Sequence, residues 1–215
     1  MSVILTKNGE YKNFDFVFLF KIIMRALTYK DLELKVLEKV YFPREDSFLV
    51  LENLKFKKGE KILELGTGSG IIAIFAAKQD ANVVATDISR IALKCAADNA
   101  KQNNVEIEFV NSNLFENVRG KFDKIIFNAP YLPGERKTLF DKAESGGPTG
   151  NELLLKAVKE SQRFLKKDGA LYVVCSSLSG RFLEKLKLKK KYNYKIIDEK
   201  AFFFERIFLV QISTN

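Results

Sequence analysis

Glu64-Leu65-Gly66-Thr67-Gly68-Ser69-Gly70 is the stretch of sequence that decides the fold. It follows the apolar run KILEL (61–65) and precedes a helical pattern at about 69–79, so it lies where a strand ends and a helix begins. The glycines allow a sharp turn there and let a ligand approach the main chain. Their G-x-G-x-G spacing differs from the G-x-G-x-x-G turn that holds a pyrophosphate, which disfavours a nicotinamide cofactor.

Asp87 is the second feature of this candidate binding site. It ends the next apolar run, NVVAT (82–86), 17 residues beyond Gly70. A carboxylate placed there in an α/β fold accepts hydrogen bonds from both hydroxyls of a ribose. A glycine turn by itself is equally compatible with a plain strand-to-helix connection. Together, the turn and Asp87 predict a cofactor that contains adenosine.

The same alternation of strand and helix continues over most of the chain. Apolar runs lie at 106–110, 122–127 and 170–175, and helical patterns lie at about 89–103 and 151–165. Because each run is apolar almost throughout, the strands are expected to be buried on both faces. This order is typical of a doubly wound α/β fold with a parallel sheet.

The two ends of the chain depart from this pattern. Two apolar runs near the C-terminus are joined by a short connection, which predicts an antiparallel hairpin. We expect the segments upstream of Lys61 to cap the sheet. The elements concerned are a Phe-rich stretch at 14–27, a strand at 32–37, a helix from Glu45, a helix at about 179–190, and the hairpin strands 194–198 and 206–212.

The composition limits the available chemistry. The chain has 215 residues, of which 47% are hydrophobic, and no histidine, which excludes Ser-His-Asp triads and histidine metal sites. Cys95 and Cys175 are 80 positions apart and offer neither a disulfide framework nor a four-ligand zinc site, so we predict no metal site and a reducing cytoplasm. One core with an appendage is expected.

The charge leaves the kind of partner open. Lys and Arg number 36 against 27 Asp and Glu, a net charge of +9, so nucleic acid stays open as a partner. The N-terminal apolar stretch is interrupted by charged residues and lacks a small-residue cleavage site, which argues against a secretory signal. It is also too short and too charged to cross a bilayer, so no membrane association is expected.

Asn128-Ala129-Pro130-Tyr131 follows the run FDKIIF (122–127) directly. Ligands of open α/β folds bind at the carboxyl edge of the sheet, so this tetrapeptide is expected near the glycine turn. Pro130 biases Ala129 away from the α region, which directs the course of the chain after the strand. The plain alternative is an Asn-x-Pro turn without function.

These segments together resemble a known family. The glycine turn with Glu64 resembles motif I of the class I S-adenosylmethionine-dependent methyltransferases, over about residues 61–215. Asn128–Tyr131 resembles, in three of four positions, the N-P-P-Y signature of members that methylate a planar nitrogen. The resemblance implies a Rossmann-like, doubly wound seven-stranded sheet, mostly parallel with an antiparallel C-terminal strand. It also implies S-adenosyl-L-methionine as the cofactor.

Two further blocks narrow the resemblance. The segment 41–49 (YFPREDSFL) resembles the Y-x-P-x-E-D-[ST]-x-L block of the HemK-type glutamine methyltransferases, and 144–154 (ESGGPTGNELL) resembles their G-G-x-x-G loop. Local alternatives are a helix start at Pro43 and a flexible loop at 132–150 that orders over substrate. The short archaeal and eukaryotic branch fits best, since only about 40 residues precede Tyr41. The predicted domains are an N-terminal extension (1–40) and a methyltransferase domain (41–215).

The resemblance also assigns roles to individual residues. Asn113 stands where the family usually has an aspartate that binds the adenine amino group, and its alternative is to cap its own turn. The predicted cofactor-binding residues are Glu45, Ser47, Glu64, Gly66, Thr67, Gly68, Gly70, Asp87, Ile88, Asn113, Leu114 and Asn128. The predicted catalytic residues are Asn128, Ala129, Pro130 and Tyr131.

The implied chemistry relies on positioning, because a planar nitrogen is a poor nucleophile and no histidine can remove its proton. The Asn128 side-chain oxygen and the Ala129 carbonyl would accept its two N–H bonds while the Tyr131 ring stacks on the planar group. The implied acceptor is the glutamine amide of the Gly-Gly-Gln motif in a peptide-chain release factor. A small zinc-binding activator protein is the implied second partner.

Three alternatives stay open at this point. An RNA or DNA methyltransferase acting on an adenine or guanine exocyclic amino group would fit the charge and the Asn128–Tyr131 segment, but it would have to flip the base out of its stack. A continuous basic groove leading to Tyr131 would favour it. A cofactor-binding module without activity would fit the departures at Ala129 and Asn113. Tyr131 could also be a core aromatic.

Overall fold

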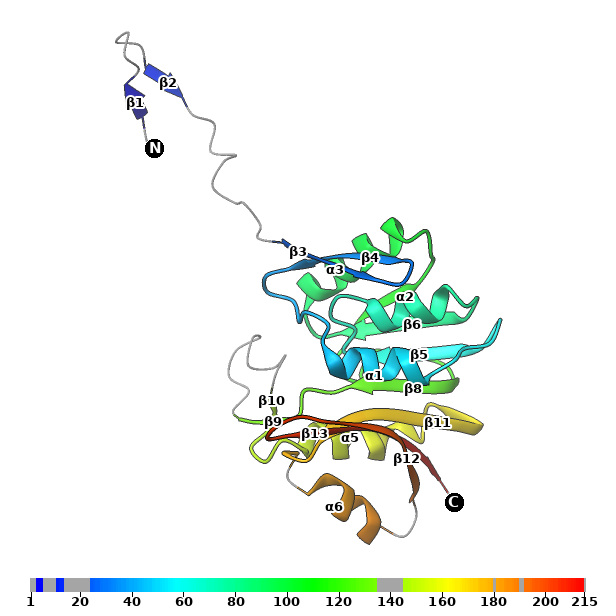
Figure 1. The fold of residues 1–215 in the computed structure, drawn as a ribbon. Coiled ribbons are helices and arrows are strands. Elements are labelled where there is room, and N and C mark those ends of the chain that lie inside the picture. The colour runs from blue at the N-terminus through cyan, green and yellow to red at the C-terminus, as the bar shows by residue number, and fades with distance from the viewer. Residues whose placement is uncertain are drawn as a thin grey trace.

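A computed structural model describes residues 3–5, 11–13, 24–134, 145–179, 181–189 and 192–214 (Figure 1). Its centre is a seven-stranded sheet in the order β12-β13-β11-β8-β5-β6-β7. The strands are β5 (Lys61–Leu65), β6 (Asn82–Asp87), β7 (Glu108–Asn111), β8 (Phe122–Asn128), β11 (Leu165–Ser176), β12 (Tyr192–Ala201) and β13 (Arg206–Thr214).

The direction of the strands confirms the predicted fold class. β5 pairs in parallel with β6 and β8, and β11 pairs in parallel with β8, whereas β13 runs antiparallel to both β11 and β12. The chain moves outward from β5 in one direction and returns to form β8 on its other side. This reversal between β5 and β8 is the switch point at which open α/β sheets bind ligands.

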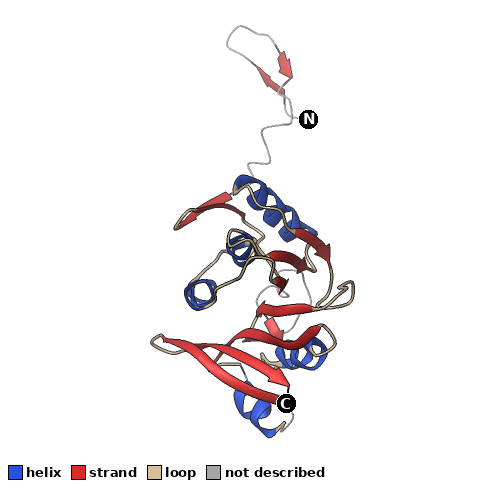
Figure 2. Ribbon diagram, turned by 90° about the vertical axis from the view of Figure 1, so that its right-hand side faces the viewer, coloured by secondary structure: helices blue, strands red, loops and turns tan. Residues whose placement is uncertain are grey.

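Helices cover both faces of the sheet (Figure 2). One face packs against α1 (Glu45–Asn53), α2 (Ile71–Ala77) and α3 (Arg90–Gln102), and the other against α5 (Glu152–Ser161) and α6 (Phe182–Leu188). Strand residues alternate between the two cores: Ile62 belongs to the first, and Leu63 and Leu65 to the second. This two-sided burial explains why each strand is apolar almost throughout.

A separate hairpin packs beside α3. It consists of β3 (Met24–Tyr29) and β4 (Leu32–Leu37), and alternate residues of β4 are buried in the first core. Asn99 Oδ1 of α3 accepts a hydrogen bond from Lys35 N at 2.8 Å, and Asn103 Nδ2 donates to Glu33 O at 2.7 Å. Residues 24–37 therefore cap the first face, as predicted, while the domain boundary at residue 40 stays a prediction.

Two further pairs of short strands lie outside the central sheet and the β3–β4 hairpin. β1 (Val3–Leu5) pairs with β2 (Tyr11–Asn13), and β9 (Leu132–Pro133) pairs with β10 (Ser145–Gly147). Residues 14–23 of the predicted Phe-rich stretch and residues 135–144 of the predicted loop lie outside the described residues. No helix in the described part of the chain is both long and apolar enough to cross a membrane.

One predicted boundary is wrong by several residues. The helix predicted to reach residue 165 ends at Ser161, and β11 begins at Leu165 rather than at 170. Phe164 stacks on Phe115 with ring centroids 4.8 Å apart, and its carbonyl accepts a hydrogen bond from Phe122 N. These tertiary contacts place Phe164 beside the sheet. The helix therefore ends earlier than the apolar pattern of the sequence predicts.

Candidate active site

A cavity of about 850 Å³ opens at the carboxyl ends of β5, β6 and β8. Its volume falls within the range of small-molecule sites. All the predicted site residues line it except Gly70. The fold thus brings together the segment before α1, the glycine turn, the ends of β6 and β7, and the tetrapeptide after β8.

The glycine turn runs from the end of β5 to the start of α2. Gly66, Gly68 and Gly70 all have positive φ, a conformation that residues with a side chain rarely adopt. Gly70 needs glycine for a second reason: a Cβ there would lie 2.9 Å from Ala96 Cβ of α3. Gly70 therefore faces α3 rather than the cavity, which explains why it does not line the cavity.

Glu64 holds the turn from inside the fold. It is 2% exposed, and its Oε2 accepts hydrogen bonds from Thr67 Oγ1 at 2.6 Å and from Ala73 N at 3.0 Å. Burial raises the pKa of Glu64 to about 8, and these hydrogen bonds only partly oppose that effect. Glu64 thus fixes the start of α2 and carries a titratable group to the cavity wall.

Asp87 connects the glycine turn with the end of β6. Its Oδ2 accepts a hydrogen bond from Gly68 N at 3.0 Å, and its Oδ1 accepts one from Ser89 N at 2.8 Å. Burial raises the pKa of Asp87, while hydrogen bonds from backbone N–H groups act in the other direction. The neighbouring Ile88 is exposed and lines the same part of the cavity.

Asn113 lies on the cavity wall, beside Leu114. Its Nδ2 donates a hydrogen bond to Glu116 Oε1 at 2.7 Å, so the side chain contributes to its own turn. The local alternative is therefore present in the structure. A carboxamide has a second polar atom, Oδ1, so binding the adenine amino group stays a prediction for Asn113.

Asn128 is held by a chain of hydrogen bonds that begins in the segment before α1. Tyr41 OH donates to Asp46 Oδ2 at 2.7 Å, and Ser47 Oγ donates to Asp46 Oδ1 at 3.2 Å. Asn128 Nδ2 donates in turn to Ser47 Oγ at 3.2 Å. Asn128 Oδ1 is buried and has no hydrogen-bond partner among the described residues. A buried acceptor without a donor costs about 1–3 kcal/mol, so such an atom calls for a ligand.

The rest of the tetrapeptide is held by the glycine-rich segment that follows. Ala129 is buried, and Tyr131 is half-buried on the cavity wall. Gly146 of β10 approaches so closely that a Cβ there would lie 2.6 Å from Pro130 O and 2.5 Å from Gly150 O. The third predicted block thus packs directly against the tetrapeptide. Burial and the nearby Asp46 raise the pKa of Tyr131.

Sequence reasoning missed several residues of the site. Tyr41 and Asp46 belong to the block at 41–49, but the resemblance assigns a role in binding only to Glu45 and Ser47. Glu205, from the connection between β12 and β13, also lines the cavity, and its Oε1 is buried without a partner among the described residues. Nothing in the local sequence around Glu205 marks it as part of the site.

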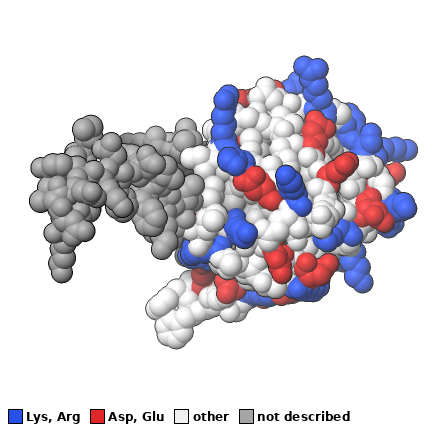
Figure 3. Space-filling model, turned by 90° about the horizontal axis from the view of Figure 1, so that it is seen from above, with Lys and Arg blue, Asp and Glu red and all other residues white. Residues whose placement is uncertain are grey.

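The charges around the cavity are mainly negative, although the whole chain is basic. Among the described residues, the carboxylates that line it are Glu45, Asp46, Asp87 and Glu205, against the cations Lys39 and Arg44, while the raised pKa of Glu64 keeps that side chain mostly neutral at pH 7. On the face seen in Figure 3, Lys and Arg are interspersed with Asp and Glu. In the described part of the chain, the surroundings of Tyr131 thus lack the continuous basic groove that nucleic acid would favour.

The fold and this site define a class of protein, the methyltransferases built on a doubly wound α/β sheet. The comparison with known families agrees: the model of the methyltransferase small domain matches residues 45–198, and the chain belongs to that family. The predicted resemblance is confirmed.

Two relatives carry more specific names. A Methanocaldococcus jannaschii protein, provisionally named a protein N5-glutamine methyltransferase, is 46% identical over 69% of this chain and 78% of its own length. The release factor glutamine methyltransferase of Lactococcus lactis is 41% identical over 48% of this chain. The chain spans 40% of that longer relative. The predicted likeness to glutamine methyltransferases is thereby confirmed.

A solved structure shares the fold. It is the complex of Mtq2 and Trm112 from E. cuniculi, described as responsible for methylating the translation termination factor eRF1. The match has a TM-score of 0.64 at 22% identity and covers 82% of this chain and 99% of that chain. At this identity, the likeness shows the fold.

Proposed function

We propose that this protein transfers a methyl group from S-adenosyl-L-methionine to the side-chain amide nitrogen of a glutamine, in the Gly-Gly-Gln motif of a peptide-chain release factor. One observation carries the proposal: Asn128 Oδ1 is a buried acceptor without a partner among the described residues, on the wall of a cavity large enough for a cofactor. An amide N–H of the substrate would satisfy it.

The cofactor fits the residues at hand. The space in front of Gly66 and Gly68 is free enough that a built Cβ would come no nearer than 3.5 Å and 3.9 Å to its closest neighbours. Asp87, at the end of β6, would accept hydrogen bonds from the ribose hydroxyls, and Asn113 and Leu114 would flank the adenine. When bound, S-adenosyl-L-methionine supplies an electrophilic methyl group on its sulfonium. The proposed cofactor side also contains the polar side chains of Glu45, Ser47, Glu64 and Thr67.

The acceptor is held by the tetrapeptide. An amide nitrogen is a weak nucleophile because its lone pair is delocalised into the carbonyl group. Asn128 Oδ1 and the Ala129 carbonyl would accept its two N–H bonds, which fixes the orientation of the nitrogen. The same oxygens stabilise positive charge that develops on the nitrogen. The methyl group would leave S-adenosylhomocysteine behind as a neutral thioether, and one N–H proton would pass to solvent to give the N-methyl amide. Tyr131, whose pKa is raised, stays neutral and offers its ring face to the planar amide.

A protein acceptor suits the charges better than a nucleic acid. The carboxylates around the cavity would repel a phosphate backbone, whereas a polypeptide presents N–H donors to them. The names of the relatives from Methanocaldococcus and Lactococcus point the same way. We propose a small activator protein as the second partner, as in the Mtq2–Trm112 complex. An adenine or guanine amino group is the alternative acceptor that the experiment must separate.

The test is to locate the transferred methyl group. The protein is incubated with methyl-labelled S-adenosyl-L-methionine and a release factor from the same organism, with and without the activator. Peptide mass spectrometry then identifies the labelled atom. We expect label on the Gly-Gly-Gln glutamine, and no label with the Asn128→Ala variant. Label that appears only on added RNA or DNA would overturn the protein acceptor, and cofactor binding without any transfer would indicate an inactive module.

A further inference from the structure

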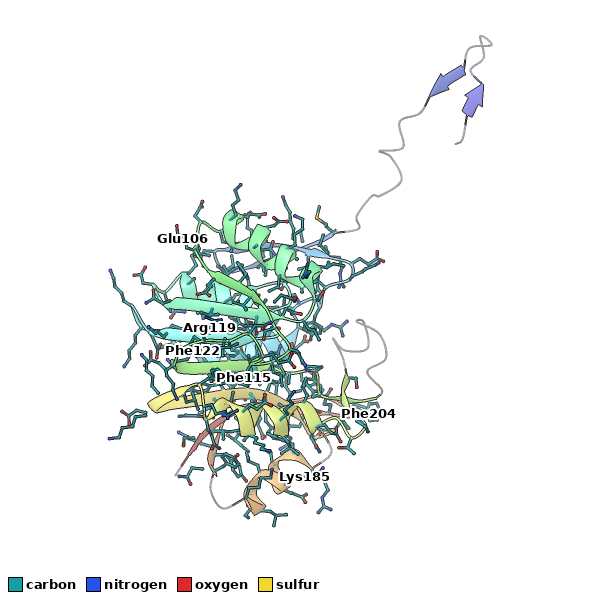
Figure 4. All side chains as sticks on the ribbon, turned by 180° about the vertical axis from the view of Figure 1, so that it is seen from behind. Glu106, Phe115, Arg119, Phe122, Lys185 and Phe204 are labelled. Carbon is teal, nitrogen blue, oxygen red and sulfur yellow. The ribbon has the colours of Figure 1, made fainter. Side chains whose placement is uncertain are left out.

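The connection between β12 and β13 carries the sequence Phe202-Phe203-Phe204-Glu205, referred to below as the hairpin tip. Phe203 and Phe204 are 92% and 85% exposed, and their rings meet edge to face with centroids 4.5 Å apart. In Figure 4, Phe204 lies at the margin of the molecule. Single exposed apolar residues are common, but an exposed aromatic cluster marks an interaction site.

The backbone of the hairpin tip is firmly held. Phe202 N donates to Glu205 O at 2.7 Å, which closes the turn. Ser177, at the end of β11, binds the next residue twice: Ser177 N donates to Arg206 O at 2.8 Å, and Arg206 N donates to Ser177 Oγ at 3.0 Å. Arg206 also pairs with Glu199 across the hairpin at 2.9 Å. The tip therefore presents its rings to solvent from a fixed position.

Glu205 lines the active-site cavity, whereas Phe203 and Phe204 do not. Together with Phe202 and Ile207, it forms the part of the cavity wall contributed by the hairpin. Tyr131 lines the same cavity, and the Glu205 carboxylate contributes, after burial and Asp46, to the raised pKa of Tyr131. Glu205 Oε1 is buried and lacks a partner among the described residues, so the cavity wall carries a second acceptor without a donor besides Asn128 Oδ1.

Resting on the proposed function, we propose that the hairpin tip is the docking element for the protein substrate. Phe203 and Phe204 pack on an apolar surface beside the acceptor glutamine, and the Glu205 carboxylate accepts a hydrogen bond from a main-chain N–H of the segment that carries it. The hairpin tip thus connects the outer surface, through Phe203 and Phe204, with the cavity, which Phe202 and Glu205 line. A polypeptide matches both parts, since it offers N–H donors and apolar side chains together.

Binding to the release factor tests the docking element without requiring turnover. Complex formation is measured by calorimetry with full-length release factor and S-adenosylhomocysteine, for wild type, the double variant Phe203→Ser/Phe204→Ser, and Glu205→Ala. Leu188→Ser is the matched control, because Leu188 is 81% exposed and does not line the cavity. We expect the dissociation constant to rise about tenfold or more in the double variant, as for a buried aromatic anchor, and to stay unchanged in the control.

Kinetics separate the two parts of the tip. With a short Gly-Gly-Gln peptide, which lacks the folded surface, the double variant should behave as wild type, whereas Glu205→Ala should raise KM. Glu205→Gln, which keeps one acceptor oxygen, should recover part of that loss. Wild-type affinity for the release factor in both tip variants would overturn the proposal, as would tip-dependent binding of RNA instead of protein. Failure of the proposed function is read separately, from the absence of label on glutamine with the wild-type enzyme.

Discussion

Asn128 Nδ2 donates its hydrogen bond to Ser47 Oγ at 3.2 Å, across 81 positions of sequence. Ser47 Oγ in turn donates to Asp46, so it offers a lone pair, and not a proton, to Asn128. The direction of these two hydrogen bonds fixes the orientation of the Asn128 carboxamide. The nitrogen faces α1, and Oδ1 is left buried and free to accept. The segment before the glycine turn thereby decides the orientation of the proposed acceptor group.

Removing that oxygen is expected to abolish most of the transfer. Asn128→Ala should lower kcat by about 10²–10³-fold, the usual effect of losing one preorganised hydrogen-bonding group in a transition state. Affinity for S-adenosyl-L-methionine should change much less, because Asp87 and the glycine turn are untouched. Single-turnover methylation and calorimetry of cofactor binding measure the two quantities. An Asn128→Ala enzyme with wild-type kcat would exclude the proposed role.

Ser47→Ala tests the orientation rather than the acceptor itself. The substitution removes the partner of Asn128 Nδ2 but leaves Oδ1 in the chain, so the carboxamide can rotate. Losing one net hydrogen bond corresponds to roughly 0.5–1.5 kcal/mol, and we expect kcat to fall about two- to tenfold. Ser47→Thr keeps the hydroxyl and should recover activity. If the alanine variant lost only cofactor affinity and kept its kcat, Ser47 would act on the cofactor alone.

The parts of this site that follow strand ends could be predicted from the sequence, and the parts assembled by the tertiary fold could not. The glycine turn, Asp87 and Asn128 each come directly after an apolar run, and parallel strands bring their carboxyl ends to one edge. Glu205 reaches the same cavity only because β13 inserts between β12 and β11. Its register against β11 depends on contacts between strands, which no local pattern records.

The burial of two asparagines, Asn99 and Asn103, could not be predicted from the sequence either. Asn99 on α3 and Asn103 directly after it are polar residues that the sequence pattern would assign to a solvated face. Both are buried, because they hydrogen-bond to the exposed backbone edge of β4. Asn99 Nδ2 also donates to Ser69 O of the glycine turn at 2.9 Å. The hairpin at 24–37 is thus linked to the proposed cofactor turn through one side chain.

The contact between Gly70 and Ala96 gives a stability prediction with a matched control. Gly70 and Gly120 have similar φ angles, +88° and +93°, but a Cβ at Gly120 would meet nothing within 4 Å. Gly120→Ala should therefore carry only the conformational cost, roughly 1–2 kcal/mol. Gly70→Ala adds an overlap with Ala96, which costs about 1–3 kcal/mol more.

Urea unfolding of the two variants measures that difference in the free energy of unfolding. The double variant Gly70→Ala/Ala96→Gly removes the overlapping methyl group and should regain part of the loss, despite the cost of a glycine inside α3. Equal destabilisation by Gly70→Ala and Gly120→Ala would mean that α3 moves away freely, and that its packing does not constrain the turn.

Glu64 makes the stability of the protein depend on pH in a direction opposite to that of a salt-bridged carboxylate. Its pKa is raised from 4.5 to about 8 in the folded protein, because the buried carboxylate is poorly solvated when charged. Below about pH 4.5 both folded and unfolded chains hold the proton, and above about pH 8 both have lost it. Between these values the folded chain binds more protons, so the contribution of Glu64 to stability falls as the pH rises.

Glu64→Gln isolates this effect, since glutamine keeps an acceptor for Thr67 and Ala73 but does not titrate. We expect the free energy of unfolding of wild type, relative to the variant, to fall by up to about 1.4 kcal/mol per pH unit between pH 5 and 8. Urea unfolding at several pH values checks the slope. A constant difference over this range would show that Glu64 stays ionised in the folded protein, with the hydrogen bonds from Thr67 and Ala73 outweighing the cost of burial.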